Sequence, residues 1–143
     1  MKIVRNDHDE KEKNDMLQTQ NTPTIKEMQS VDGMSASELD GLPFGAIRLD
    51  KNGTILSYNA TEAKLTGRDP KRVIGKNFFT QVAPCTNVQA FAGRFREGVA
   101  KGDMHEIFPY RFDFEMAPRD VTVTLFYSQQ TGTAWVFVRE SQA

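Results

Sequence analysis

The sequence predicts an α+β fold in which one antiparallel sheet of five strands is flanked by short helices and carries an N-terminal cap segment. Two short β-prone runs come first, a helical stretch of about forty residues follows, and three strands of alternating polarity close the chain. With 143 residues, of which 38% are hydrophobic and 26% charged, the chain has the size and composition of one globular domain.

The first part of the chain differs in composition from the rest. Residues 1–34 contain no aromatic side chain and are rich in Asp, Glu, Lys, Asn and Gln. This composition predicts a polar, mobile N-terminal tail or cap over 1–34 and places the folded domain at 35–143. Ile25, Met28 and Val31 have near-helical spacing, so the end of the segment could instead dock as a short amphipathic helix.

Two short strands are predicted next, at Phe44–Leu49 and Thr54–Tyr58. Between them stands Asp50-Lys51-Asn52-Gly53, and an Asn-Gly pair readily adopts the positive φ angles of a tight turn. The two strands should therefore form a hairpin.

Helix signals follow the hairpin. Asn59 suits a helix N-cap with Glu62 as the acid at the third position, and Gly67 suits the C-terminal stop of the same helix. Asp69-Pro70 opens a second short turn, which ends at Gly75.

The longest helix is predicted over residues 87–101, with Gly102 as its terminator. Four apolar side chains should share its buried face: Val88, Phe91, Phe95 and Val99.

Three strands close the chain. Apolar and polar side chains alternate from Phe108 to Met116 and again over residues 121–127, and a third run covers residues 134–138. Turns rich in Pro, Asp, Gly and Thr separate these runs, so we expect an antiparallel meander that pairs with the first hairpin. Two strands, helices and then three strands is the order of elements in a PAS domain.

Charge and hydropathy exclude several classes of partner. A formal net charge of −1 gives no electrostatic basis for binding nucleic acid or an anionic membrane. No apolar run approaches the roughly 18 residues of a spanning helix, and residues 1–15 lack the apolar middle of a secretory signal. We therefore expect a cytoplasmic protein, and both a monomer and a weak dimer are compatible with the sequence.

Cys85 is the single cysteine, so it cannot form an internal disulfide, and with His8 and His105 as the two histidines we expect no metal site. Its thiol is either buried as a small hydrophobe, the more common state, or used for its chemistry. A thiol enzyme would need a base beside the nucleophile. Because His8 lies in the polar segment and His105 in a predicted loop, we do not expect an enzyme.

From Leu39 to Val138 the sequence resembles the photoactive yellow protein family of PAS-fold blue-light receptors. The resemblance is carried by LDGLPFGAIRLD, by ILSYNATEAKLTGRDPKRVIGKNFFTQVAPC and by the late WVFV, in that order and at matching spacing.

This resemblance implies p-coumaric acid (4-hydroxycinnamic acid) as the cofactor, held by a thioester to Cys85 in the Ala-Pro-Cys segment. Tyr58 and Glu62 would hydrogen-bond the phenolate oxygen, Thr66 would support Tyr58, and Arg68 would cover the ring from the solvent side. A further set of side chains would line the pocket: Ile47, Val82, Ala83, Pro84, Thr86, Phe112 and Met116.

The resemblance also implies a photocycle. Light would isomerise the double bond of the chromophore from trans to cis, and Glu62 would donate a proton to the phenolate. A buried, newly charged Glu62 would destabilise the structure, and the polar N-terminal cap should unfold first. The partly unfolded cap would signal to a downstream protein whose identity the sequence does not contain.

Other interpretations stay open at this point. By local pattern alone, Tyr58 is a core residue at a strand end and Glu62 a capping-box acid. The chain could be a PAS module that binds another small molecule or only a protein partner. It also departs from the family in its longer N-terminal segment, in Phe114 and in the turn between Ser128 and Thr133.

Overall fold

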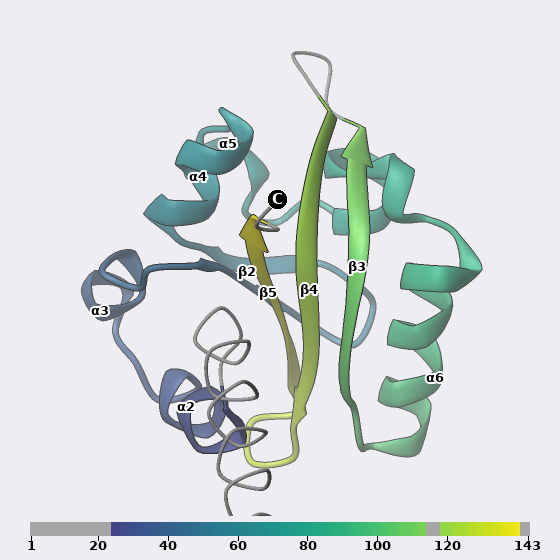
Figure 1. Cartoon of the computed structure of the whole chain (residues 1–143). Helices are drawn as coiled ribbons and strands as arrows, with labels where there is room; N and C mark the ends of the chain where they lie inside the picture. The colour runs from purple at the N-terminus through teal and green to yellow at the C-terminus, as the bar shows by residue number, and fades with distance from the viewer. Residues whose placement is uncertain (1–23, 114–117, 141–143) are drawn as a thin grey trace, which may run out of the picture.

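A computed structural model describes residues 24–113 and 118–140, and a five-stranded antiparallel sheet organises them (Figure 1). The strands follow the order β2-β1-β5-β4-β3 across the sheet. Their bounds are Gly45–Leu49 (β1), Ile55–Tyr58 (β2), His105–Asp113 (β3), Pro118–Ser128 (β4) and Thr133–Glu140 (β5). The predicted fold class is confirmed, because β1 pairs both with β2 and with the last strand of the chain.

The first hairpin closes at the predicted turn. Gly53 has φ 89°, a left-handed conformation that side chains with a Cβ atom rarely adopt. The carboxylate of Asp50 accepts hydrogen bonds from the backbone N–H groups of Asn52 and Thr54, each at 2.9 Å. These contacts satisfy turn donors that the β1–β2 ladder leaves unpaired.

Helices α4 (Ala60–Thr66) and α5 (Pro70–Val73) begin where their caps predict. The side chain of Asn59 accepts from the N–H of Glu62 at 3.0 Å, and Gly67 ends α4 with φ 71°. Asp69 caps α5 in the same way through the N–H of Lys71.

The prediction of one helix over residues 87–101 is wrong in its first half. The α-helix α6 spans only Arg94–Lys101 and ends at Gly102. It is preceded by a π-helical turn, Gln89–Gly93, and Val88 is extended and 47% exposed instead of buried. The reason is local: a single residue, Asn87, separates Val88 from a tight turn at Pro84–Thr86, so the regular helix starts later.

The late strands lie where alternation predicts, with wider bounds. Strand β3 starts at His105, three residues before the predicted start, so His105 is an exposed strand residue and not part of a loop. Phe108 and Phe112 are buried, while Pro109 and Arg111 between them are exposed. Phe114 and Met116 lie outside the described residues.

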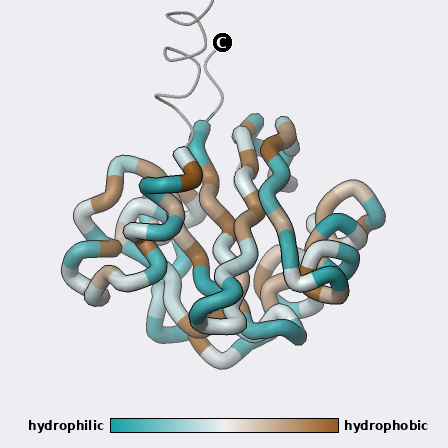
Figure 2. The backbone as a smooth tube through the Cα atoms, turned by 90° about the horizontal axis from the view of Figure 1, so that it is seen from below, coloured by the Kyte–Doolittle hydropathy of each residue, from teal (hydrophilic) through white to brown (hydrophobic). Residues whose placement is uncertain are grey.

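The sheet has a buried cluster on each face, and Figure 2 shows apolar segments along the strands with helical segments on both sides. Successive side chains of β5 point to opposite faces of the sheet. Val136 and Val138 therefore pack into the larger cluster, and Trp135 and Phe137 pack into the smaller one. Helices α4 to α6 cover the first face, and the N-terminal helices cover the second (Figure 1).

The N-terminal helices are α2 (Ile25–Val31) and α3 (Ala36–Asp40), each opened by a capping box. Met28 and Val31 of α2 are fully buried against the smaller cluster, while Ile25 is 50% exposed. Residues 25–31 thus dock as the short amphipathic helix that their spacing allowed. Residues 1–23 lie outside the described part of the chain, and the boundary between residues 34 and 35 stays a prediction.

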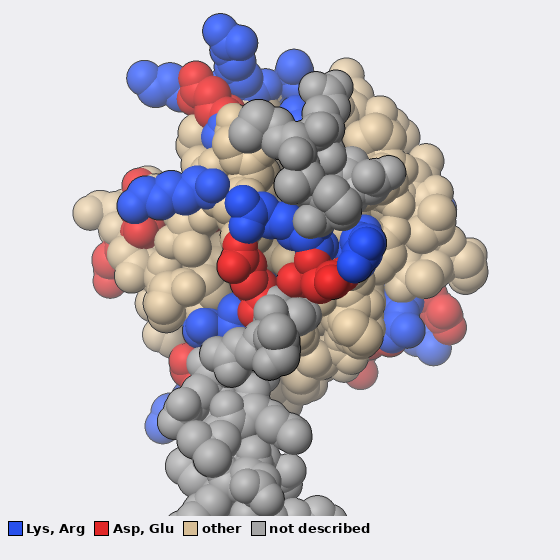
Figure 3. All heavy atoms as spheres, turned by 45° about the horizontal axis from the view of Figure 1, so that its top comes forward, with Lys and Arg blue, Asp and Glu red and all other residues tan. Residues whose placement is uncertain are grey.

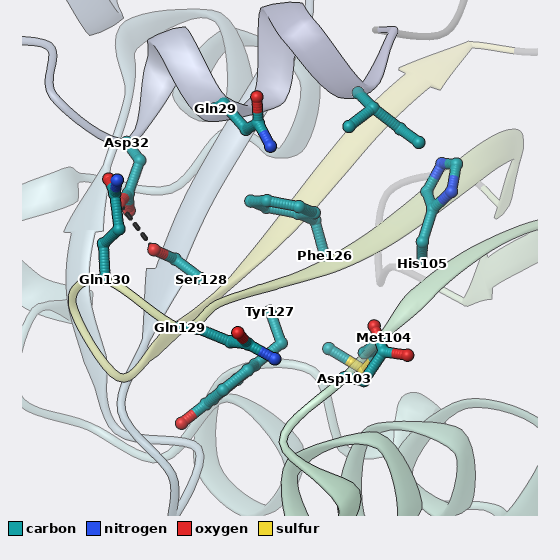
Figure 4. Close-up of a pocket in the computed structure, with 11 residues that line it drawn as sticks. Gln29, Asp32, Asp103, Met104, His105, Phe126, Tyr127, Ser128, Gln129 and Gln130 are labelled. Carbon is teal, nitrogen blue, oxygen red and sulfur yellow. Dashed lines mark hydrogen bonds between the residues drawn. The ribbon is translucent and has the colours of Figure 1, made fainter.

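Asp32, at the end of α2, connects the N-terminal helices to the sheet, and α2 and α3 together are called the cap from here on. Its carboxylate accepts from Trp135 Nε1 at 2.9 Å, from Ser128 Oγ at 2.6 Å and from Arg48 Nη2 at 2.6 Å. Figure 4 shows the Ser128 contact beside a hollow of about 430 Å³ that contains none of the predicted site residues. Burial alone would raise the pKa of Asp32, but these hydrogen bonds and the Arg48 charge outweigh it and hold the pKa below 3.8.

Replacing Asp32 with Ala should lower the free energy of unfolding by about 3 kcal/mol, because Trp135, Ser128 and Arg48 would lose a buried acceptor. The carboxylate stabilises the fold above its ordinary pKa of 3.8, and this contribution disappears as the pH falls below that value. Chemical denaturation followed by fluorescence of Trp135 measures the difference. Asp103→Ala, at an exposed position, is the control and should stay within about 0.5 kcal/mol of the unchanged chain; equal effects of the two changes would contradict the role of Asp32.

Candidate functional site

The carboxyl group of Glu62 is buried in the interior of the domain. The side chain is 1% exposed, and its Oε1 atom makes no hydrogen bond within the described residues. It lies against β1, where a Cβ atom on Gly45 would be 2.0 Å from Oε1, so only glycine leaves room for the carboxyl group. Burial raises the pKa of Glu62 to about 8, which keeps the group protonated near neutral pH.

Tyr58 lies beside Glu62 at the end of β2 and is 6% exposed. Its hydroxyl is 2.7 Å from Thr66 Oγ1, which is itself 3.0 Å from the backbone oxygen of Glu62. Thr66 has a single hydroxyl hydrogen, so when it donates to that backbone oxygen, Tyr58 must be the donor to Thr66. Burial, followed by the charge of Glu62, raises the pKa of Tyr58 well above its ordinary value of 10, so the phenol remains a donor.

Cys85 is a free, half-buried thiol in the 3-10 turn Pro84–Thr86 (η2). Thr86 holds the turn together, because its hydroxyl donates to the backbone oxygen of Ala83 at 2.6 Å. Tyr110 on β3 donates its own hydroxyl to the backbone oxygen of Cys85 at 2.5 Å. The thiol therefore occupies a defined position at the edge of the larger cluster.

The structure brings most of the predicted lining residues into one cluster with Tyr58. Five of them are buried: Ile47, Val82, Ala83, Thr86 and Phe112. Pro84 is exposed, and Met116 lies outside the described residues. The elements β1, β2, β3 and the turns before α6 thus contribute to one buried cluster, and Cys85 packs against it.

Arg68 is exposed at the edge of this site and donates its backbone N–H to Thr66 Oγ1 at 3.4 Å. It also lines an open hollow of about 390 Å³ together with Arg72, Lys76 and Val82. Figure 3 shows Lys and Arg side chains gathered at the upper edge of the molecule. The hollow beside Arg68 thus carries three basic side chains and one acidic side chain, Asp69.

Asn59 is a site residue whose full role the sequence did not indicate. Its Oδ1 accepts from the N–H groups of Ala46 and Glu62, and its Nδ2 donates to the backbone oxygens of Leu39 and Phe44. The capping pattern predicted the bond to Glu62, but the other three partners depend on how α3 and β1 pack. One buried amide thus joins the helix of Glu62 to the cap.

Known proteins share this architecture. Residues 34–139 match the PAS fold family. The photoactive yellow protein of Rhodothalassium salexigens is 52% identical over 106 residues, which cover 74% of this chain and 85% of that protein. That of Halochromatium salexigens is 51% identical over 110 residues, which cover 77% of this chain and 88% of the relative. The chain belongs to the photoactive yellow protein family.

Solved structures agree with this assignment. The photoactive yellow protein domain of the sensor histidine kinase Ppr from Rhodospirillum centenum superposes with a TM-score of 0.75 at 49% identity, over 78% of this chain and 98% of that domain. The PAS domain of an HTR-like protein from Haloarcula marismortui, at 18% identity, 82% and 100% coverage and TM-score 0.58, shares the fold alone. Photoactive yellow proteins are photoreceptors and not enzymes, and this chain is a photoreceptor.

The described part of the chain offers neither a metal site nor a membrane-spanning helix. Within residues 24–113 and 118–140, no three His, Cys, Asp or Glu side chains are grouped so that they could hold a metal ion. In the same ranges, no helix has the length and apolar character needed to cross a membrane.

In the chain without a bound cofactor, Glu62 should make stability depend on pH. Between about pH 4.5 and 8 the folded chain keeps a proton on Glu62 that the unfolded chain has released, so raising the pH favours unfolding. This loss should reach about 5 kcal/mol near pH 8. Glu62→Gln stays neutral and should not show it.

Denaturant titrations of both chains from pH 5 to 8 measure this difference. The unfolding free energy of Glu62→Gln minus that of the unchanged chain should grow with pH. Glu38→Gln, which removes an exposed carboxylate, is the control. A difference that does not change with pH would contradict the burial of a protonated Glu62.

Proposed function

We propose that this chain is a blue-light receptor that carries a p-coumaroyl group as a thioester on Cys85. The observation that supports the proposal best is the carboxyl oxygen of Glu62, which is buried without a hydrogen-bond partner among the described residues. A buried polar atom without a partner is costly, and a ligand oxygen at this position would remove the cost. Bound there, the group would supply absorption of blue light and trans–cis isomerisation of its double bond.

The donor set suits the phenolate end of such a group. A buried phenolate needs hydrogen-bond donors, and protonated Glu62 and Tyr58 are two neighbouring donors. The apolar lining suits a flat ring and its double bond, and the thiol of Cys85 would form the thioester. Arg68 would shield the site from solvent, while Pro84 and Met116 would complete the lining.

Thr66 would allow Tyr58 to change partner. Without a bound anion, Tyr58 donates to Thr66, and Thr66 donates to the backbone oxygen of Glu62. When Tyr58 turns its hydrogen toward a phenolate, Thr66 can rotate its own hydrogen toward the Tyr58 oxygen. The pair would thus adapt to the charge with two hydroxyl rotations and no backbone movement.

Glu62 would be the proton donor in the signalling step. With its pKa raised to about 8, it is neutral near pH 7 and can transfer its proton to the phenolate oxygen. The transfer would leave a carboxylate in a fully buried position. We expect a penalty of roughly 4 to 7 kcal/mol, which is comparable with the stability of a whole domain of roughly 5 to 15 kcal/mol.

The cap would respond to this charge because it is one strand away. Gly45 of β1 touches the Glu62 carboxyl group, and its neighbour Ala46 packs into the cluster that holds α2. Asn59 connects the first turn of α4 to the backbone of Leu39 in α3. Movement of α4 would therefore strain contacts on both sides of β1 and weaken the docking of the cap.

The released cap would be the surface that a downstream signalling protein recognises. A photoactive yellow protein domain within a sensor histidine kinase shows that members of the family occur attached to such partners. For this chain a downstream signalling partner, a cytoplasmic location and a monomeric or weakly dimeric state stay predictions.

Reconstitution with an activated p-coumaric acid derivative tests the attachment. The unchanged chain should gain the mass of one p-coumaroyl group and absorb blue light, whereas Cys85→Ala should do neither because it lacks the sulfur nucleophile. Glu62→Gln is the matched control and should gain the same mass with a shifted colour. Covalent pigment on Cys85→Ala would refute the thioester, and an unchanged chain without pigment would favour a PAS module with another ligand.

Light should lower the hydrogen-exchange protection of the cap by about tenfold or more in α2 and α3. The amides of α6, which lies on the other face of the sheet, provide an internal comparison and should change less. Equal protection of the cap in darkness and under illumination would exclude its release. The same experiment on Glu62→Gln separates the effect of the new charge from that of isomerisation.

A further inference from the structure

The turn that carries Cys85 is stabilised mainly by hydrogen bonds between its own residues. Thr86 N–H and Thr86 Oγ1 both bond to the backbone oxygen of Ala83, at 2.9 and 2.6 Å, and Asn87 N–H bonds to that of Pro84 at 3.1 Å. None of these bonds uses the backbone oxygen of Cys85 itself. A single 3-10 turn has poor hydrogen-bond geometry, so it needs outside contacts to fix its orientation.

Tyr110 supplies such a contact. Its hydroxyl donates to the backbone oxygen of Cys85 at 2.5 Å, although the two residues are 25 positions apart in the sequence. The backbone of Tyr110 pairs with Val121 in the middle of the β3–β4 ladder. The bond therefore connects the attachment residue directly to the sheet. It lies on the main chain of Cys85 and leaves the sulfur free to react.

The ring of Tyr110 is itself held in place. It makes edge-to-face contacts with Phe91 at 5.2 Å and with Phe112 at 5.7 Å between ring centroids. Phe91 is fully buried in the π-helical turn before α6, and Phe112 is a buried residue of the same strand as Tyr110. A hydroxyl on a ring packed in this way points in one direction.

The hydroxyl of Tyr110 stays protonated and can therefore remain a hydrogen-bond donor. Burial and the charge of Cys85 raise its pKa above the ordinary value of 10. The phenol therefore keeps its hydrogen and remains a donor at neutral pH.

We propose that Tyr110 is a positioning residue that orients Cys85 for acylation and then fixes the sulfur end of the attached group relative to β3. This inference rests on the thioester of the proposed function. In the reaction, the thiolate of Cys85 attacks one carbonyl carbon of an acid anhydride and a C–S bond forms. The bond between that carbon and the bridging oxygen breaks, and the other half of the anhydride leaves as a carboxylate. Tyr110 takes no part in bond making and acts through the direction of the thiol.

Tyr110→Phe keeps the ring and its packing while removing the hydrogen bond, so it tests orientation specifically. The control is Tyr127→Phe on the neighbouring strand. Tyr127 also packs against the larger cluster, but its hydroxyl has no hydrogen-bond partner among the described residues.

Two reactions of the chromophore-free full-length chain should be compared: acylation of Cys85 by p-coumaric anhydride, and alkylation by iodoacetamide. The bulky acyl donor needs a correctly directed thiol, whereas the small reagent needs only access. The ratio of the acylation rate to the alkylation rate should fall about 3- to 10-fold in Tyr110→Phe, as expected for one hydrogen bond. It should stay unchanged in Tyr127→Phe.

The outcomes separate the alternatives. An unchanged ratio in Tyr110→Phe overturns the positioning role, even if the variant is less stable, because a purely structural contribution changes both rates alike. Acylated chains that fail to absorb blue light would contradict the proposed function, while their rates would still test Tyr110. Absence of acylation in the unchanged chain would overturn both.

Discussion

Burial of the Glu62 carboxyl group is the constraint on which the site depends. Its Oε1 atom has left water without gaining a hydrogen bond in the described chain, and burial raises the pKa of the group to about 8, so it stays protonated near neutral pH. Gly45 leaves room for this side chain, and Asn59 caps the helix that carries it. In the proposed function, this proton is the one that Glu62 would donate at neutral pH.

The sheet connects the surroundings of Glu62 to the N-terminal helices. Its two faces carry separate clusters, and β1 contributes alternate residues to each. Glu62 lies against β1 on one face of the sheet, and Met28 and Val31 pack on the opposite face. The cap is tied down by Asp32, whose partners come from β1, β4 and β5. The docking of the cap therefore depends on the geometry of three of the five strands.

The sequence predicted those features that arise within a few residues of chain. The Asn-Gly turn, the Asn59 cap, the Gly67 stop and the alternation in β3 depend on local backbone preferences and on periodicity, and all are present. Local rules also explain the one wrong helix. Apolar spacing suggested a continuous helix over residues 87–101, but the tight turn at Pro84–Thr86 left Val88 extended and forced a π-helical turn.

The fold class could be predicted from the order of periodic segments, and the family from the motifs around Tyr58, Glu62 and Cys85. The contacts that join distant segments became apparent in the folded structure alone. Asp32 meets Trp135 across 103 positions, and Tyr110 meets Cys85 across 25. No local preference encodes such pairs, because they form only after the two faces of the sheet have packed and brought these side chains within hydrogen-bond distance.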